Sequence, residues 1–231
     1  MSTVTQTPPL SNGFAGSYLI SDAALYLRAT MDLGKLPALT SRHLHYWIRE
    51  GLAARYVRGV QGAHRFITFA DLVSFRAIAI MRAHGVKPKE IRIVEAELRR
   101  TYGWEYPFAM APFWTWAPDV VLRVNEHLVA VSRHWQMAMA FIERDLKPVH
   151  NLTFDLWDHP SDWAPQDGIL LTPTVQYGEP CITGTRIPTQ VVWAFNRAGD
   201  SLDDLARMYG LPKAKLKVAV DWERRLHQAA A

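Results

Sequence analysis

The chain has 231 residues and can therefore form two small domains with a connection between them. With 49% hydrophobic and 21% charged residues, its composition is that of a folded protein rather than a disordered one. The net charge of +4 permits a polyanionic partner without requiring one, and the single cysteine, Cys181, excludes an internal disulfide framework or a cysteine-rich zinc site.

The N-terminus, MSTVTQTPPLSNGFAG, is polar and has neither the basic stretch nor the apolar segment of a signal peptide. No apolar run approaches the roughly 20 residues that a membrane-spanning helix needs. We therefore expect residues 1–17 to be a flexible tail and the protein to be cytoplasmic.

Residues 18–103 predict a winged helix-turn-helix domain, because their elements follow the order helix, helix, hairpin, helix. In chain order the segments are a short strand at 18–20, helices at 22–28 and 40–50, a hairpin within 54–69, and helices at 71–84 and 90–100. Thr40 or Ser41 is suited to cap the second helix, which is expected to end at Gly51.

The helix predicted over residues 40–50 has two faces of different chemistry. The apolar face comprises Leu44, Trp47 and Ile48. The opposite face comprises Arg42, His45, Tyr46 and Arg49. Hydrogen-bond donors and flat rings suit base edges and phosphates in a major groove, and Ser41 with the free N–H groups of the first turn can hold a phosphate. The alternative is a surface helix with an arginine-rich solvent face.

The hairpin behind this helix strengthens the DNA hypothesis, because it extends the positive charge. From residue 42 to residue 65 the only acidic residue is Glu50, whereas the arginines are Arg42, Arg49, Arg55, Arg58 and Arg65. His64 lies beside the last of these arginines. The pattern predicts that the hairpin is a wing that contacts DNA.

The run TSRHLHYWIREGL, a glycine-containing turn, HRFITFADL and an apolar helix together resemble the MerR family of winged helix-turn-helix regulators over about residues 18–100. The resemblance implies that Ser41–Glu50 reads DNA and that the wing contacts phosphates. The positions carried over are Ser41, Arg42, His45, Tyr46, Arg49, His64 and Arg65. The connection at 29–39 is several residues longer than the tight turn usual in the family. The effector-domain cysteines of its metal sensors are absent, so metal sensing is not expected.

Residues 104–170 are rich in aromatic residues and prolines and predict a small α+β connector that forms dimers. The aromatic cluster comprises Trp104, Tyr106, Phe108, Phe113, Trp114 and Trp116. Such a cluster can be a satellite core, a protein interface or a pocket for a flat or cationic ligand. For the interface alternative, the candidate partner-binding residues are Trp114 and Trp116.

Residues 171–231 predict a β-hairpin around Gly184 and Thr185 followed by three helices that include a helix-turn-helix-like pair. The helices are expected at 191–198, 202–209 and 213–226. Ser201 and Asp204 are in a capping-box relation at the start of the second helix. Lys213 and Lys217 share a face of the third, which either touches DNA or is a solvated lysine face.

The segments GEPCITGTRIP and SLDDLARMYGLPKAKLKVAV resemble domain-of-unknown-function family 433, whose members accompany PIN-type toxins in bacterial toxin–antitoxin operons. Joined to a MerR-like domain, this region resembles the VapB-type antitoxins. The resemblance implies a repressor of its own operon that also neutralises a PIN-type ribonuclease. Candidate partner contacts are Tyr177, Thr185 and Arg186, and the alternative for the last two is a structural hairpin.

Nothing in the sequence predicts an enzyme. No P-loop, GxGxxG, HExxH or GxSxG pattern occurs, and Cys181 has no histidine nearby in the sequence. We expect no cofactor and no metal, and a homodimer because winged-helix proteins commonly bind paired half-sites. The expected fold is mainly α with short β elements (α+β), divided at residues 17, 103 and 170. The alternative function is a ligand-responsive MerR-like regulator with an aromatic pocket.

Overall fold

A computed structural model describes residues 16–30, 39–52, 58–59, 65–115 and 151–230. In the first part of the chain the elements are β1 (Tyr18–Leu19), α1 (Ile20–Thr30), α2 (Ser41–Arg49), β2 (Arg58–Gly59), β3 (Arg65–Ile67), α3 (Phe69–Ala83) and α4 (Pro88–Tyr102). Within the described ranges, no helix is both long and apolar enough to cross a membrane.

The three strands form an antiparallel sheet in the order β1-β3-β2. Because β1 pairs with β3, the N-terminal strand is joined to the hairpin rather than standing alone. Two local caps begin the helices that follow. The Thr68 hydroxyl accepts the backbone N–H of Asp71 at 3.2 Å, and the Glu90 carboxylate accepts the backbone N–H of Lys87 at 2.8 Å. The order of elements predicted for the winged helix-turn-helix is therefore present.

In the second part of the chain, the described residues from 151 onward contain a four-stranded antiparallel sheet and three α-helices. After the 3-10 helix η1 (Pro107–Ala109) and α5 (Ala111–Thr115), its elements are β4 (Leu152–Phe154), β5 (Pro160–Gln166), β6 (Ile169–Leu171), the 3-10 helix η2 (Gln176–Gly178), β7 (Cys181–Ile182), α8 (Thr189–Ala198), α9 (Leu202–Tyr209) and α10 (Lys213–Ala230). The strand order is β4-β5-β6-β7. The boundary expected between residues 170 and 171 thus falls inside β6, because this sheet continues through it.

The C-terminal helices follow the sequence pattern closely. The Ser201 hydroxyl accepts the backbone N–H of Asp204 at 3.1 Å, as the capping pattern predicts. Gly199 and Gly210 end α8 and α9 in the left-handed region, where glycine avoids the cost of a Cβ. Together with the short sheets, these helices confirm the predicted α+β fold with its C-terminal hairpin and three helices.

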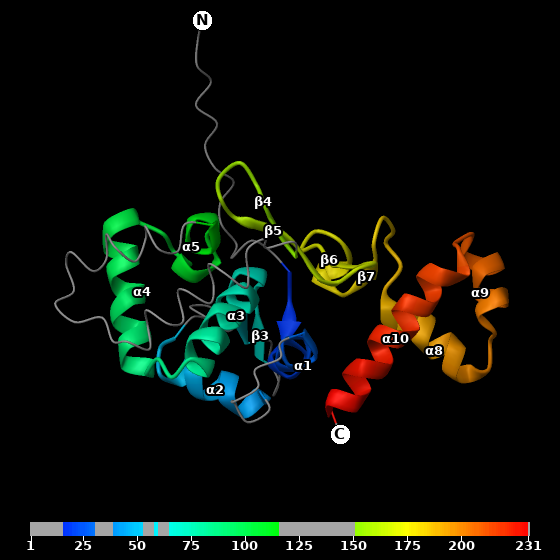
Figure 1. Cartoon of the computed structure of the whole chain (residues 1–231), viewed down its shortest axis with the longest axis horizontal. Coiled ribbons are helices and arrows are strands. Elements are labelled where there is room, and N and C mark those ends of the chain that lie inside the picture. The colour runs from blue at the N-terminus through cyan, green and yellow to red at the C-terminus, as the bar shows by residue number, and fades with distance from the viewer. Residues whose placement is uncertain (1–15, 31–38, 53–57, 60–64, 116–150, 231) are drawn as a thin grey trace, which may run out of the picture.

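Two hydrophobic cores meet at α1. The larger core surrounds α3 and the smaller one lies among β6, β7, α8, α9 and α10. Helix α1 contributes Ala24 and Leu27 to the first core, and Leu25 and Tyr26 pack against the second. Figure 1 shows α1 between α3 and the C-terminal helices, and α1 contacts both α2 and α10. The helix that supports α2 is therefore also attached to the C-terminal part of the chain.

Most of the aromatic cluster belongs to the larger core. Phe108, Phe113 and Trp114 are buried, and the Trp114 indole N–H donates to the carbonyl of Phe108 at 2.9 Å. The Arg76 guanidinium lies 5.5 Å from the Trp114 ring centre and 5.7 Å from that of Trp163, and burial lowers its pKa to about 10. Proposing Trp114 as a partner contact was wrong, because its ring is completely covered by the core. Trp116 lies outside the described residues.

The side chain of Glu223 on α10 is buried, and this burial changes the titration of its carboxyl. The residue is 7% exposed, and its carboxylate accepts a hydrogen bond from the Thr189 hydroxyl, which also lies 3.2 Å from the carbonyl of Pro180. Burial raises the pKa of Glu223, as does the charge of Glu179, whereas Thr189 and His227 oppose the shift. The folded state therefore holds this proton more tightly than the unfolded chain does.

This pKa predicts a pH dependence that Glu223→Gln removes. A raised folded-state pKa contributes stability that is present below the unfolded-state pKa and is lost as the pH rises through the folded-state pKa. Each unit of the shift corresponds to about 1.4 kcal/mol. Compared with wild type, the glutamine variant should therefore become relatively more stable from pH 4.5 upward. Urea denaturation of both proteins across this range measures the difference, and a difference that does not change with pH would contradict the prediction.

Candidate nucleic-acid interface

The N-terminus of α2 is capped by an unusual pair. The backbone N–H of Thr40 donates to Nδ1 of His43 at 3.2 Å, and the Thr40 hydroxyl lies 2.9 Å from the same nitrogen. Because a backbone N–H can only donate, Nδ1 is an acceptor, and the proton of the neutral ring is on Nε2. His43 thus takes the position that glutamate or glutamine usually has in a capping box. This contact joins the first turn of α2 to Thr40, the residue that precedes the helix.

The inner face of α2 is fixed by the larger core. Leu44 and Trp47 are buried, Ile48 is half-buried, and the Trp47 ring lies 6.2 Å from the ring of Phe75 on α3. Burying side chains of this size stabilises the fold by about 1.5–3 kcal/mol each. The predicted apolar face is confirmed, and the opposite face is consequently turned to solvent.

The outer face of α2, called here the recognition face, consists of Arg42, His45, Tyr46 and Arg49. All four side chains are exposed, and Ser41 is half-buried at the start of the helix. The Arg49 guanidinium carbon lies 5.5 Å from the centre of the Tyr46 ring. These residues, with His43 and Ile48, line a shallow depression on the surface. The structure therefore brings the predicted helix residues together on one accessible surface.

The acidic residue at the end of this helix is paired. Arg92 on α4 donates from Nη1 to the carbonyl of Glu50 at 3.1 Å, and the same nitrogen lies 3.6 Å from the Glu50 carboxylate. The contact joins α4 to the C-terminal end of α2 and offsets the negative charge beside the recognition face.

We expect Arg92→Ala to have a small effect on folding and a measurable effect on DNA binding. The pair is at the surface, so its loss should change the free energy of unfolding by less than about 1 kcal/mol. Glu50 would then repel phosphates without compensation, which should weaken binding by about 0.5–1 kcal/mol. Chemical denaturation and fluorescence anisotropy measure the two effects, and full DNA affinity in a folded variant would contradict the expected role of Arg92.

The wing is only partly described. Arg58 and Arg65 lie in the paired strands β2 and β3, where Gly59 is the register partner of Arg65. Their side chains, and all of Arg55 and His64, lie outside what the structure describes. Their predicted contacts with DNA therefore remain predictions.

The C-terminal candidates have different surroundings. Tyr177 is 80% exposed, and Arg186 is also exposed, so both are accessible to a partner. The Thr185 hydroxyl donates to the carbonyl of Ile182 at 2.8 Å and accepts the backbone N–H of Ile187 at 3.1 Å. Thr185 therefore closes the turn, in agreement with the alternative that it has a structural role in the hairpin.

The two lysines on α10 each pair with a carboxylate. Lys213 lies 2.8 Å from Asp203, and Lys217 pairs with Asp221 one turn further along the helix. These contacts agree with a solvated lysine face rather than with a face prepared for phosphates.

The comparison with known families agrees with this geometry. Residues 32–98, which include α2, the hairpin, α3 and most of α4, match the family model described as "MerR HTH family regulatory protein". Residues 169–222 match the model described as "Protein of unknown function (DUF433)". The chain combines a MerR-type helix-turn-helix with a DUF433 region. The composition predicted from the sequence is thereby confirmed, whereas neither match concerns a toxin.

A crystal structure of Rv2018 from Mycobacterium tuberculosis has a similar fold. Its TM-score with this structure is 0.70, over 88% of this chain and 96% of that chain, at 19% sequence identity. At this identity the likeness shows the fold alone, and it extends over both the helix-turn-helix and the DUF433 region. The search of curated proteins gave no match.

Sequence reasoning missed the contacts that join the two regions. The backbone N–H of Ser17 donates to the carbonyl of Tyr177 at 2.9 Å, and the Tyr18 ring packs on Gly178. Tyr177 and Gly178 both have positive φ, at 55° and 91°. The glycine in YGEP indicates a turn, but nothing in the sequence pairs that turn with the first strand.

Proposed function

We propose that the protein is a DNA-binding transcription regulator rather than an enzyme, and that it binds operator DNA with the recognition face of α2. The observation that carries the proposal is that all four side chains of this face are exposed on a helix whose inner face is held by the core. The match of residues 32–98 to a helix-turn-helix family supports it.

The chemistry of the recognition face suits a major groove. The groove is about 12 Å wide and admits a helix. Arg42 and Arg49 each provide a planar set of donors for guanine or phosphate, and His45 and Tyr46 add further polar contacts and flat surfaces. The protein would act in the cytoplasm, as a homodimer that binds two half-sites one helical turn apart.

A mobility shift with DNA from upstream of the protein's own gene tests this proposal. We expect a shifted band that the unlabelled fragment removes and that unrelated DNA of the same length does not. Binding of equal strength to both DNAs, or to neither, would contradict sequence-specific regulation.

The finer proposal is that the protein is an antitoxin, which represses its own operon and neutralises a PIN-type ribonuclease by direct binding. The resemblance of GEPCITGTRIP and the following helices to a family found beside such toxins supports it. So does the exposed apolar surface of the DUF433 region, where Val191 and Phe195 on α8 and Met208 on α9 are 38%, 40% and 59% exposed. Exposed apolar side chains of this size are typical of protein interfaces.

Co-expression with a PIN-type protein encoded beside its gene tests the antitoxin role. We expect the two to purify together and the ribonuclease to be inactive in the complex. Phe195→Asp should abolish co-purification, whereas the matched control Ile93→Asp, on α4 and 43% exposed, should retain it. An active ribonuclease in the presence of excess wild-type protein would refute the role.

A further inference from the structure

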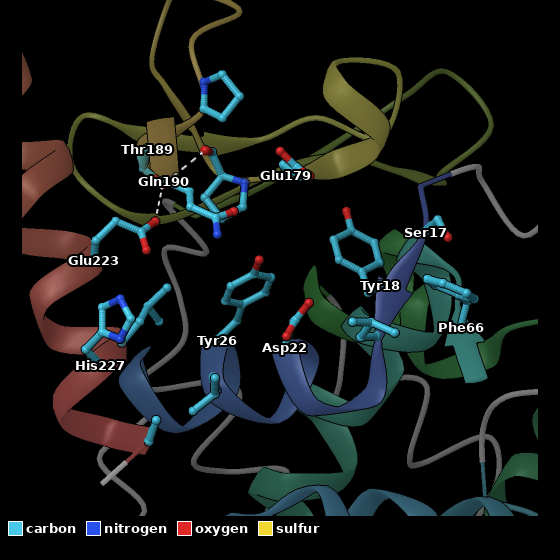
Figure 2. A pocket seen from close by; sticks show the side chains of 16 residues that line it. Ser17, Tyr18, Asp22, Tyr26, Phe66, Glu179, Thr189, Gln190, Glu223 and His227 are labelled. Atoms are coloured by element: carbon cyan, nitrogen blue, oxygen red, sulfur yellow. Dashed lines mark hydrogen bonds between the residues drawn. The ribbon is translucent and has the colours of Figure 1, made fainter. Parts of the chain in front are cut away.

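A cavity lies where the helix-turn-helix region meets the C-terminal helices. Its volume is about 380 Å³, within the range of roughly 300–1,000 Å³ usual for small-molecule sites. One wall comes from β1 and α1, and the other comes from residues 179–190 and α10. Figure 2 shows side chains from both walls turned toward the space between them. We call this space the seam cavity.

The seam cavity is acidic. Its ionisable acids are Asp22 on α1, Glu179 before β7, and Glu223 on α10. Among the described residues that line it there is no lysine or arginine, and His227 is the one side chain that could carry a positive charge near neutral pH. Burial raises the pKa of Asp22 and of Glu223, so the surroundings disfavour the ionised form of each carboxyl relative to water. A bound cation would remove this penalty.

A buried hydroxyl provides an independent indication of a ligand. Tyr18 lines the cavity and is 3% exposed, yet its hydroxyl has no hydrogen-bond partner among the described residues. In Figure 2 the hydroxyls of Tyr18 and Tyr26 point the same way, toward the side on which Glu179 lies. A buried hydroxyl without a partner costs about 1–3 kcal/mol, so a polar atom of a ligand beside it would be stabilising.

The charges of all three acids act on the hydroxyl of Tyr26. Burial raises the pKa of its hydroxyl, and the charges of Asp22, Glu223 and Glu179 raise it further. The rings of Tyr26 and Tyr18 are 6.5 Å apart and perpendicular, so they present an aromatic face as well as hydroxyl oxygens. Aromatic faces and carboxylates together bind organic ammonium groups.

The arrangement of the acids favours an elongated cation over a metal ion. No three histidine, cysteine or acidic side chains of the described residues come together as a metal-ligand set. Asp22 is on one wall, whereas Glu179 and Glu223 are on the other, and Leu25 and Leu226 provide apolar surface in the same cavity. Two ammonium groups joined by methylene groups match this alternation of charge and apolar surface.

We propose that the seam cavity binds an aliphatic diamine or polyamine, with one ammonium group at Asp22 and another at Glu179 and Glu223. The ligand would bridge α1 to α10, and α1 in turn packs on the recognition helix α2. The site is separate from the recognition face, and it differs from the aromatic pocket that the sequence offers as an alternative, since Phe108, Phe113 and Trp114 of that cluster belong to the core.

Isothermal titration of the full-length protein with putrescine and with spermidine, in the absence of DNA, tests the proposal. We expect saturable binding of one molecule per chain. Asp22→Asn and Glu179→Gln should each weaken it about tenfold or more, because each removes a charged hydrogen-bond acceptor. The matched control Asp203→Asn removes an exposed carboxylate on α9 and should bind as wild type does.

Circular dichroism checks that each variant is folded. Because Glu179 is exposed, Glu179→Gln is the cavity variant least able to disturb the core. No heat of binding at millimolar diamine would overturn the proposal, as would equal binding by wild type and both cavity variants. An equal heat from Mg²⁺ at matched charge would also overturn it, because the site would then select charge alone. Since the titration contains no DNA, its outcome does not depend on the proposed regulatory function.

Discussion

Replacing Gly178 by alanine is expected to destabilise the protein by about 2–5 kcal/mol. A Cβ at this position would lie 2.1 Å from the Tyr18 hydroxyl oxygen and 2.6 Å from the ring carbon that carries it. The backbone φ of 91° adds a further cost for any residue other than glycine. The ring has little freedom to move, because it packs at a right angle to Tyr26 and against Phe69. Urea denaturation measures the decrease in stability.

Gly184 is a control that distinguishes the clash with Tyr18 from the cost of the positive φ. Gly184 also has positive φ, 80°, but a Cβ there would meet nothing within 4 Å. Gly184→Ala should therefore cost only about 1–2 kcal/mol. In a Tyr18→Leu background, Gly178→Ala should cost less than it does in wild type, because the clash is relieved. Equal destabilisation at the two glycines would show that Tyr18 does not constrain residue 178.

The contact between Tyr18 and Gly178 joins two regions that are far apart in the sequence. Tyr18 precedes the first helix of the helix-turn-helix region, whereas Gly178 belongs to the turn before the DUF433 hairpin. Together with the hydrogen bond from Ser17 to Tyr177, the contact fastens one region to the other. The two regions should consequently unfold in one transition rather than as independent domains.

Arg42→Ala and Arg49→Ala are each expected to weaken operator binding by about 1–3 kcal/mol, or roughly 5- to 150-fold. Both guanidinium groups are exposed on the recognition face, and the only contact described for either is that of Arg49 over the Tyr46 ring at 5.5 Å. Because these side chains contribute little to the core, the free energy of unfolding should change by no more than about 0.5 kcal/mol. Fluorescence anisotropy with labelled operator DNA measures the affinity.

Arg100→Ala is the control for these variants. Arg100 is an exposed arginine on α4 whose described partner is Glu97, and it lies outside the recognition face. Its removal should leave operator affinity within about twofold of wild type. If Arg100→Ala weakened binding as much as Arg42→Ala and Arg49→Ala, the effect would reflect total charge, and the assignment of the recognition face would be wrong.

The helix-turn-helix geometry was largely predictable from the sequence, because it depends on local patterns. On a helix with 3.6 residues per turn, Leu44 and Trp47 lie on the face opposite Arg42 and Arg49. In the structure the first pair is buried and the second is exposed. The Ser201 cap is likewise a short-range pattern. Features of this kind depend on residues no more than four positions apart, so they can be recognised in a single sequence.

What the sequence did not predict depends on contacts between distant residues. Composition could not decide whether Trp114 was core or surface, because an aromatic cluster with prolines suits both. In the structure it shares a core with Trp163, far along the chain, and Arg76 of α3 lies against both rings. Asp22, Glu179 and Glu223 likewise come together only when α1 packs on α10. The boundary expected after residue 170 falls inside β6, a strand too short for its pairing partners to be recognised from the sequence.

The salt dependence of operator affinity is the most direct test of DNA binding by α2. For wild type, the logarithm of the association constant should fall linearly and steeply with the logarithm of salt concentration, because binding to phosphates releases counterions. If the two arginines contact phosphates, the Arg42→Ala, Arg49→Ala double variant should have a slope that is shallower by about one for each phosphate no longer neutralised. If they contact bases, the affinity of this variant for operator should fall toward its affinity for unrelated DNA. A flat slope for wild type, or identical slopes and affinities for the two proteins, would contradict DNA binding through this face.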